Sequence, residues 1–198
     1  TSPGDAHTSE MVRHAVTSPA TLVDIGEETN AHASGGIGQS KTHWFVWSGG
    51  GYGPSTSGVH NSGPYTTQIE KSTFASPTTS TDSGGDLSVA TGSSLGFTDL
   101  VGAKCWAMGG EAQPAASNTE KIESFPTAIS SGNQTDEGEL VQTVSWGGSS
   151  NSTTNWYISG FNPQSDNIYK GSFTAPVAST DIGELTQACY SSYHSSGD

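Results

Sequence analysis

The sequence is poor in basic residues and has no long hydrophobic run. Its 198 residues include 6 lysines and arginines against 19 aspartates and glutamates, a formal net charge of −13. Nucleic acids and anionic lipid surfaces are bound through clustered lysine and arginine, and here these residues are scattered singly, so we expect neither partner. No segment approaches the roughly 20 apolar residues that a membrane-spanning helix needs, so we expect no insertion into a membrane.

Cysteine and hydrophobic residues are also scarce. Cys105 and Cys189 are too few for a fold held together by disulfides. Hydrophobic residues make up 31% of the chain, whereas serine, threonine and glycine together make up about 41%. Low hydrophobicity with high net charge can indicate disorder, but 5 Trp, 6 Tyr and 6 Phe recur at regular positions. Helical periodicity is missing, because small residues and proline interrupt every segment. We therefore expect a folded, all-β chain.

Four Asp-x-Gly motifs reveal an internal repeat. The motif residues are Asp24 and Gly26, Asp82 and Gly84, Asp136 and Gly138, and Asp181 and Gly183. An apolar residue lies 13 or 14 positions before each aspartate, at Met11, Ile69, Ile122 and Ile168. We expect these four residues to occupy equivalent buried strand positions. The spacing predicts one all-β domain over residues 1–198, with four repeats of about 46–58 residues that start near 11, 69, 122 and 168.

A short aromatic strand recurs within each repeat. Phe45, Trp106, Trp156 and Tyr193 each lie four residues before a glycine, and we assign this column to the core. Regular short strands without helices favour a closed or radially repeated sheet fold, which leaves few unpaired edges. The last of these strands, at residues 193–196, falls where the first repeat would need it. We therefore expect the N- and C-terminal strands to pair and to close a β-propeller-like ring.

The motifs resemble the repeats of kelch-like β-propeller proteins. The resemblance rests on Trp106-Ala-Met-Gly-Gly and on the strands Gln68-Ile-Glu-Lys and Asn167-Ile-Tyr-Lys. A narrower resemblance rests on a strand that begins Ile-Glu-Lys and ends in Phe, followed by Asp-x-Gly-Glu-Leu. This pattern is similar to the degenerate repeats of virion structural proteins of marine and cyanobacterial phages. The resemblance implies a viral protein on the exterior of a bacteriophage or cyanophage virion: a tail, tail-fibre or capsid-surface component. Such a component contributes to assembly or host attachment and contacts other virion proteins or its own copies.

Two other functions remain open from the residues themselves. One is a glycan-binding, lectin-like propeller, and the other is an extracellular cell-surface or filament subunit. Three tryptophans outside the core column, Trp44, Trp47 and Trp146, present flat apolar faces that suit sugar rings. Tyr52, His60 and Tyr65 lie in a long loop predicted over Gly51–Thr67, and loops of this kind carry recognition on a rigid scaffold. These six residues are our candidate glycan or receptor contacts.

The Asp-x-Gly motifs have two interpretations. A carboxylate beside backbone carbonyls could bind Ca²⁺, but one carboxylate for each motif is few. Alternatively, each aspartate caps a tight turn with its own side chain, and the glycine supplies a positive φ. We favour the turn, and treat the eight motif residues as structural positions.

The sequence contains no arrangement typical of an enzyme. It lacks a Gly-x-Ser-x-Gly elbow, its six histidines show no metal-ligand spacing, and no pair of carboxylates stands out for glycoside hydrolysis. We therefore predict no catalytic, cofactor or metal site. The expected location is the virion surface or another extracellular setting.

Overall fold

The computed structural model of the chain is all-β. It describes residues 10–13, 23–27, 35–47, 50–52, 62–75, 80–112, 117–128, 132–174 and 179–189. These ranges hold nineteen strands, β1 to β19, and no helix. In this part of the chain, no helix has the length and apolar character needed to span a membrane. The expected fold class is confirmed.

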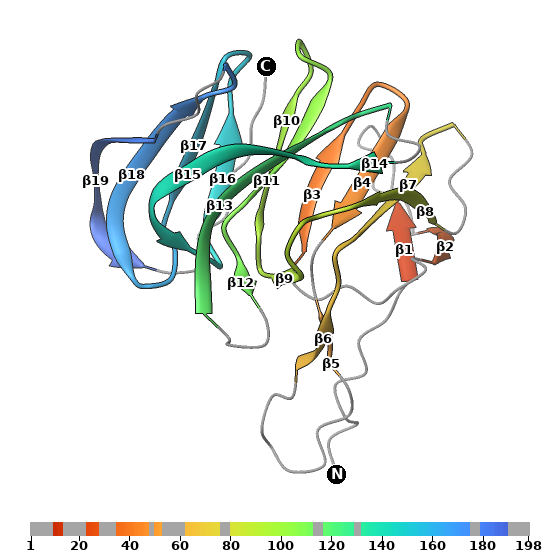
Figure 1. The fold of residues 1–198 in the computed structure, drawn as a ribbon, viewed down its shortest axis with the longest axis horizontal. Helices are drawn as coiled ribbons and strands as arrows, with labels where there is room; N and C mark the ends of the chain where they lie inside the picture. Colours follow the sequence, from red (N-terminus) through yellow and green to blue (C-terminus); the bar gives the residue numbers. More distant parts are fainter. Residues whose placement is uncertain are drawn as a thin grey trace.

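Three sheets, each built around four antiparallel strands, lie side by side and follow one another along the chain (Figure 1). The first sheet contains β3 (Gly36–Gln39), β4 (His43–Trp47), β7 (Gln68–Thr73) and β8 (Thr81–Asp86). The second contains β10 (Leu95–Asp99), β11 (Lys104–Met108), β13 (Ser117–Pro126) and β15 (Thr135–Val144). The third contains β16 (Gly148–Asn151), β17 (Asn155–Ser159), β18 (Ser165–Ser172) and β19 (Thr180–Cys189).

The remaining strands are short, and they either pair with each other or extend the first and second sheets. β1 (Glu10–Arg13) pairs with β2 (Val23–Glu27), β5 (Gly50–Tyr52) pairs with β6 (Ser62–Tyr65), and β12 (Glu111–Ala112) lies between β13 and β9 (Thr91–Gly92). β14 (Gly132–Asn133) runs parallel to the outer strand β8 of the first sheet. β1 and β2 form a separate two-stranded sheet, and by the repeat spacing they correspond to β7 and β8 of the first sheet. Pairing of residues 193–196 with this unit lies outside the described residues, so ring closure stays a prediction.

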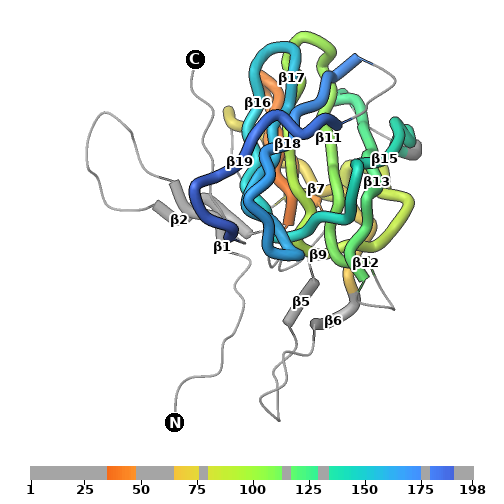
Figure 2. Tube along the Cα trace, turned by 90° about the vertical axis from the view of Figure 1, so that its left-hand side faces the viewer, coloured from red at the N-terminus to blue at the C-terminus, as the bar shows by residue number. Residues whose placement is uncertain are grey.

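The first strand of each sheet lies innermost, and β10 packs against both β3 and β16. In Figure 2, viewed from the side of the third sheet, β16 to β19 lie in front of the other two sheets. The side chains between neighbouring sheets form two hydrophobic clusters. In one of them Phe125 from the second sheet meets Trp47 from the first edge to face, with ring centroids 5.1 Å apart. Stacking of sheets through such layers is the β-propeller-like arrangement.

The predicted repeat corresponds to equivalent strands. Met11, Ile69, Ile122 and Ile168 lie on β1, β7, β13 and β18, each of which precedes an Asp-x-Gly strand. Ile69 and Ile122 are fully buried as predicted. Ile168 is only half-buried, and the neighbouring Tyr169 is buried instead. The prediction of burial is therefore wrong for Ile168.

The Asp-x-Gly motifs lie inside β2, β8, β15 and β19, not in turns between strands. The middle residue of the motif is the extra residue of a β-bulge: Ile122 faces Gly138, and the next residue, Glu123, already faces Asp136. The same shift places Ile168 opposite Gly183 and Tyr169 opposite Asp181. The expected tight turn is thus corrected to a bulge, although the role expected of aspartate and glycine in it is retained.

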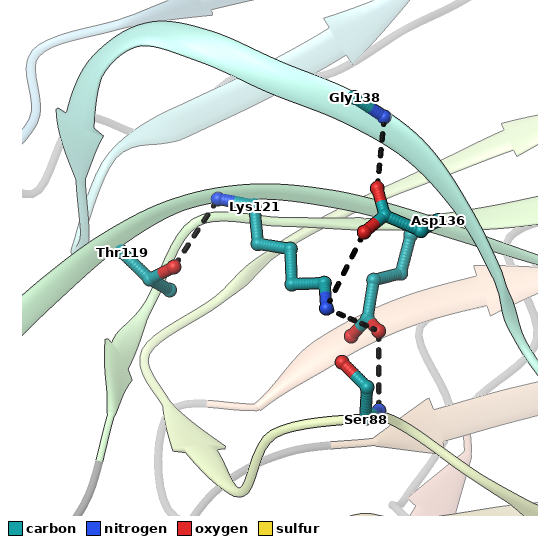
Figure 3. A network of polar contacts seen from close by, with 6 residues as sticks. Ser88, Thr119, Lys121, Asp136 and Gly138 are labelled. Carbon is teal, nitrogen blue, oxygen red and sulfur yellow. Dashed lines mark hydrogen bonds and ion pairs between the residues drawn. The ribbon is translucent and has the colours of Figure 1, made fainter.

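Neighbouring sheets are also tied by polar contacts (Figure 3). Ser88, in the segment that leaves the first sheet, donates its N–H to Oε1 of the buried Glu123 in β13, at 3.1 Å. Lys121 Nζ lies 3.8 Å from that oxygen and 3.5 Å from Asp136 Oδ2. Between the second and third sheets, Val141 N donates to Ser179 Oγ at 3.0 Å. These contacts fix the sheets around the innermost strands.

Candidate functional site

A pocket of about 420 Å³ opens where the three innermost strands lie side by side. Its lining comes from β3, β10 and β16 and from the turns that follow β10 and β16, with one residue from β4 and one just after β7. The three strands belong to three different sheets. The pocket is therefore a product of how the sheets are arranged around their inner edges.

The β3 side of the pocket is apolar and aromatic. Ile37, Trp44 and Phe74 line it. Ile37 is 66% exposed and Phe74 is 46% exposed, while Trp44 is half-buried. Along β3, residues alternate between the two faces, so Ile37 and Gln39 are exposed while Gly36 and Gly38 are buried. The apolar side chain of Ile37 is thus directed away from the core.

The middle of the pocket is formed by β10 and the turn that follows it. Thr98, Leu100 and Val101 line this part. The turn is held by Asp99, whose Oδ1 accepts hydrogen bonds from Val101 N at 3.0 Å and Gly102 N at 2.8 Å. An aspartate that bonds the backbone two residues on is a typical turn former. It fixes Leu100 and Val101 in exposed positions, with 56% and 79% of their surfaces accessible.

The β16 side is entirely polar. The residues that line it are Ser149, Ser150, Asn151, Ser152 and Thr153. Ser149 Oγ donates to Gly96 O at 3.1 Å. Asn151 Nδ2 donates to Thr98 O at 3.0 Å and to Ser152 O at 3.1 Å. Since both hydrogen bonds use Nδ2, the Oδ1 atom of Asn151 is left to accept one from a ligand.

Close contact between β3 and β10 forms the floor of the pocket. A side chain at Gly96 would meet the backbone O and N of Ile37, so only glycine permits this approach. Gln39 N donates to Thr98 Oγ1 at 2.9 Å. Behind these residues lies the fully buried Cys105. Burial raises the pKa of its thiol to about 12, because it outweighs the hydrogen bonds with the Thr98 side chain and the Gln39 backbone, which lower the pKa. Cys105 is therefore an unreactive core residue.

The pocket is uncharged and rich in exposed apolar surface. None of its lining residues carries an ionisable side chain. Six large hydrophobic side chains are exposed in the described part of the chain, and Ile37, Phe74, Leu100 and Val101 of these six line the pocket. Single exposed hydrophobic residues are common, but a group around one concavity marks a binding site.

Of the four predicted contact residues whose side chains the structure describes, one lines this pocket. Trp44 does, whereas Trp47 is fully buried and packs against Phe125, so its prediction as a ligand contact is wrong. Trp146 is half-buried and lies outside the pocket, and its backbone N–H donates to Ser93 O at 3.2 Å. Tyr65 is half-buried and donates its hydroxyl to Glu111 Oε2 at 2.9 Å, also away from it. His60 and the side chain of Tyr52 lie outside the described residues.

Most residues that line the pocket are not among the predicted contacts. Phe74 is one of these residues, since it is exposed and lines the pocket. Leu100 and Val101 could have been predicted from the sequence. They are two adjacent apolar residues between Asp99 and Gly102, in a turn where apolar side chains are rarely needed for folding. In the core column, Phe45, Trp106 and Trp156 are fully buried as predicted, and Tyr193 lies outside the described residues.

The structural positions of the repeat bind their own backbone. Gly84 N, Gly138 N and Gly183 N donate to Oδ1 of Asp82, Asp136 and Asp181, at 2.7, 3.1 and 3.0 Å. These are the hydrogen bonds that the turn interpretation predicts for the aspartates. The side chain of Asp24 lies outside the described residues. Each observed carboxylate is thus used by the bulge in which it lies.

Comparisons with known proteins bear on the fold alone. No protein-family model and no curated protein matches the sequence. Among solved structures, that of YjhT is similar, with a TM-score of 0.72 and 8% sequence identity over 92% of this chain. The chain spans 61% of the length of YjhT. At this identity the likeness supports an all-β, propeller-like fold and carries no residue role from one protein to the other.

Proposed function

We propose that the protein is a non-enzymatic recognition protein that binds an uncharged glycan in the pocket between β3, β10 and β16. The composition of the lining is the observation that carries this proposal. Aromatic and aliphatic side chains lie on one side, hydroxyl and amide groups lie on the other, and no ionisable side chain is among them. The volume of about 420 Å³ falls in the usual range for small-molecule sites.

The two sides of the pocket suit the two kinds of surface on a sugar. A pyranose ring has an apolar face of C–H groups, which stacks on an aromatic ring such as that of Trp44 or Phe74. Its hydroxyl groups need donors and acceptors, which Asn151 Oδ1 and the hydroxyl of Thr153 can supply. An anionic sugar would find no cation in the lining, and the net charge of −13 would repel it. The site therefore favours a neutral glycan.

Binding without turnover fits the chemistry of the lining. Hydrolysis of a glycosidic bond generally requires two carboxyl groups that flank the bond. The nearest carboxylate along the lining strands is Asp99, which is 7% exposed and engaged with the backbone of its own turn. This engagement leaves it poorly placed to donate or accept a proton in the pocket.

The proposed setting is the exterior of a virion, where glycan binding would serve host attachment. This part of the proposal rests on the resemblance of the repeats to those of phage structural proteins. A rigid, acidic scaffold with a neutral pocket is consistent with attachment to surface polysaccharide. Other virion proteins or further copies of the chain are the partners that we expect.

A glycan array tests the binding function. We expect the protein to bind neutral oligosaccharides, and Trp44→Ala to reduce the affinity by at least about 10-fold, as loss of a stacked aromatic ring does in binding sites. Trp146→Ala is the matched control, since it removes the same ring from a half-buried position outside the pocket. Thermal melts of both variants check that they fold. If the array shows no neutral glycan, or if Trp44→Ala binds as the parent does, the proposed function or its site is wrong.

The virion setting has its own test. Mass spectrometry of purified particles should detect the chain, and brief protease treatment of intact particles should cleave it before it cleaves internal proteins. Detection only in the soluble fraction of cells would contradict the proposed location without affecting the glycan-binding proposal.

A further inference from the structure

We infer that the pocket selects sugars with a methyl group at the ring edge, either the C6 methyl of a 6-deoxyhexose or the acetamido methyl of an N-acetylhexosamine, over the parent sugars with a hydroxymethyl or a hydroxyl group at that position. This inference rests on the proposed function and names its substrate class. It arises from the unequal distribution of apolar and polar groups around the pocket, and specifically from aliphatic side chains that stacking does not require.

The apolar part of the lining is larger than a sugar face needs. Trp44 and Phe74 already provide aromatic surface on the β3 side. Ile37, Leu100 and Val101 add three aliphatic side chains, each more than half exposed. None of these three belongs to a hydrophobic core cluster. They therefore do little for the fold, and a ligand that covers them would remove apolar surface from water.

The aliphatic side chains occupy a defined part of the site. β10 lies between β3 and β16, so Leu100 and Val101, in the turn after β10, stand between the aromatic side and the polar side. The hydrogen bonds from Val101 N and Gly102 N to Asp99 hold this turn in place before any ligand arrives. A sugar stacked on the β3 side with its hydroxyls toward β16 would direct a substituent at the ring edge to these two residues.

The substituent that fits them is a methyl group. A hydroxyl against Leu100 and Val101 would lose water without gaining a hydrogen bond, which is costly. A methyl group there loses nothing and buries apolar area. One methyl or methylene in an apolar site discriminates by about 10- to 200-fold. Because the two side chains are widely exposed, we expect the lower end, about 10-fold.

Matched sugar pairs test this selection. The probes are the methyl glycosides of L-fucose and L-galactose, of L-rhamnose and L-mannose, and of N-acetylglucosamine and glucose, with binding measured by NMR titration. Members of the first two pairs differ by a methyl group against a hydroxymethyl group, and members of the third by an acetamido group against a hydroxyl. We expect at least one pair to show about a 10-fold preference for the 6-deoxy or N-acetylated member over its hydroxylated partner. The pair in which this preference appears shows whether the natural ligand is a 6-deoxy sugar or an acetamido sugar.

Two variants assign the preference to the turn. Val101→Ser and Leu100→Ser should reduce it to about 3-fold or less while leaving the affinity for the hydroxylated sugar nearly unchanged. Val141→Ser is the matched control, since Val141 is 58% exposed, on β15 and outside the pocket. Equal binding within every pair, with binding still dependent on Trp44, would overturn this inference and leave the proposed function standing. No binding of any of the six probes or of any arrayed glycan would overturn both.

Discussion

At the scale of single residues, several aspartates accept hydrogen bonds from the backbone, and this role accounts for them better than a catalytic or metal-binding role. Asp82, Asp136 and Asp181 each accept a hydrogen bond from the glycine two residues later. In the turn after β10, Asp99 accepts hydrogen bonds from the backbone N–H groups of Val101 and Gly102. A short polar side chain next to a residue with an unusual backbone conformation is a local feature. It can therefore be predicted from the sequence without knowledge of the fold.

Removal of one such carboxylate should cost about 1 kcal/mol, the usual contribution of one hydrogen bond of this kind. We expect Asp82→Ala to lower the free energy of unfolding by this amount in urea denaturation, because Gly84 N loses its acceptor while φ at Gly84 remains +82°. Asp166→Ala is the control, since the described residues give the Asp166 carboxylate no hydrogen bond. A rise in melting temperature with added Ca²⁺ that Asp82→Ala abolishes would instead support the ligand interpretation.

Glu137 contributes stability that depends on pH. Burial pushes its pKa up, but hydrogen bonds from Lys104 and Ser124 and the charge of Lys104 outweigh burial, so the pKa of Glu137 lies below its ordinary value of 4.5. Lys104 Nζ is 2.8 Å from Glu137 Oε1. Because the folded state favours the charged carboxylate, its contribution is present above pH 4.5 and is lost as the pH falls through the lowered pKa.

The test is the stability of Glu137→Gln as a function of pH. We expect the variant to be less stable than the parent by about 1 kcal/mol at pH 7, a modest value because Lys104 is 39% exposed and water screens the pair. The difference should shrink below pH 4.5 and vanish once the carboxylate is protonated. A constant difference between pH 7 and pH 3 would show that the charge of Glu137 is not its source.

At the scale of elements, the alternation of apolar and polar residues does not identify the buried side chains of a strand that is covered on both faces. β4 carries Trp44, Phe45, Val46 and Trp47, and the last three are all buried. Alternation distinguishes core from surface only where one face of a sheet meets water, and the stacked sheets cover both faces here. For this reason the sequence could not tell that Trp47 is a core residue and that Trp44 lines a pocket. The repeat predicted the aromatic strand and the strand that follows it in each unit, but it placed the Asp-x-Gly motifs in turns rather than in strands.

The contact between β3 and β10 depends on a single missing side chain. Gly96→Ala would place a methyl group against the backbone of Ile37, which cannot move without separating the two strands. We expect a loss of about 1–3 kcal/mol in the free energy of unfolding, the usual cost of overpacking. Urea denaturation measures it, with Ser150→Ala on β16 as the control for a substitution on an innermost strand. An unchanged stability would mean that β3 and β10 do not approach this closely.

At the scale of the whole molecule, the site arises from three sheets and is invisible in any one repeat. Ile37, Val101 and Asn151 are far apart in sequence and belong to the first, second and third sheets. The repeat predicts that such sheets stack, but it does not say which loops meet at their inner edges. Polar contacts such as Ser88 to Glu123 contribute to that geometry, and Ser88 lies outside the repeated motifs. The fold was therefore predictable at the level of class and repeat, whereas the pocket required coordinates.

The central claim is that an uncharged glycan binds between β3, β10 and β16. Backbone amide NMR of the ¹⁵N-labelled protein, titrated with the neutral glycan that scores highest on the array, tests it most directly. We predict that the largest shift changes occur at Ile37, Leu100, Val101 and Asn151, and that they saturate with one dissociation constant. Saturating changes confined to residues around Trp146 or Tyr65, with the pocket residues unmoved, would contradict the claim.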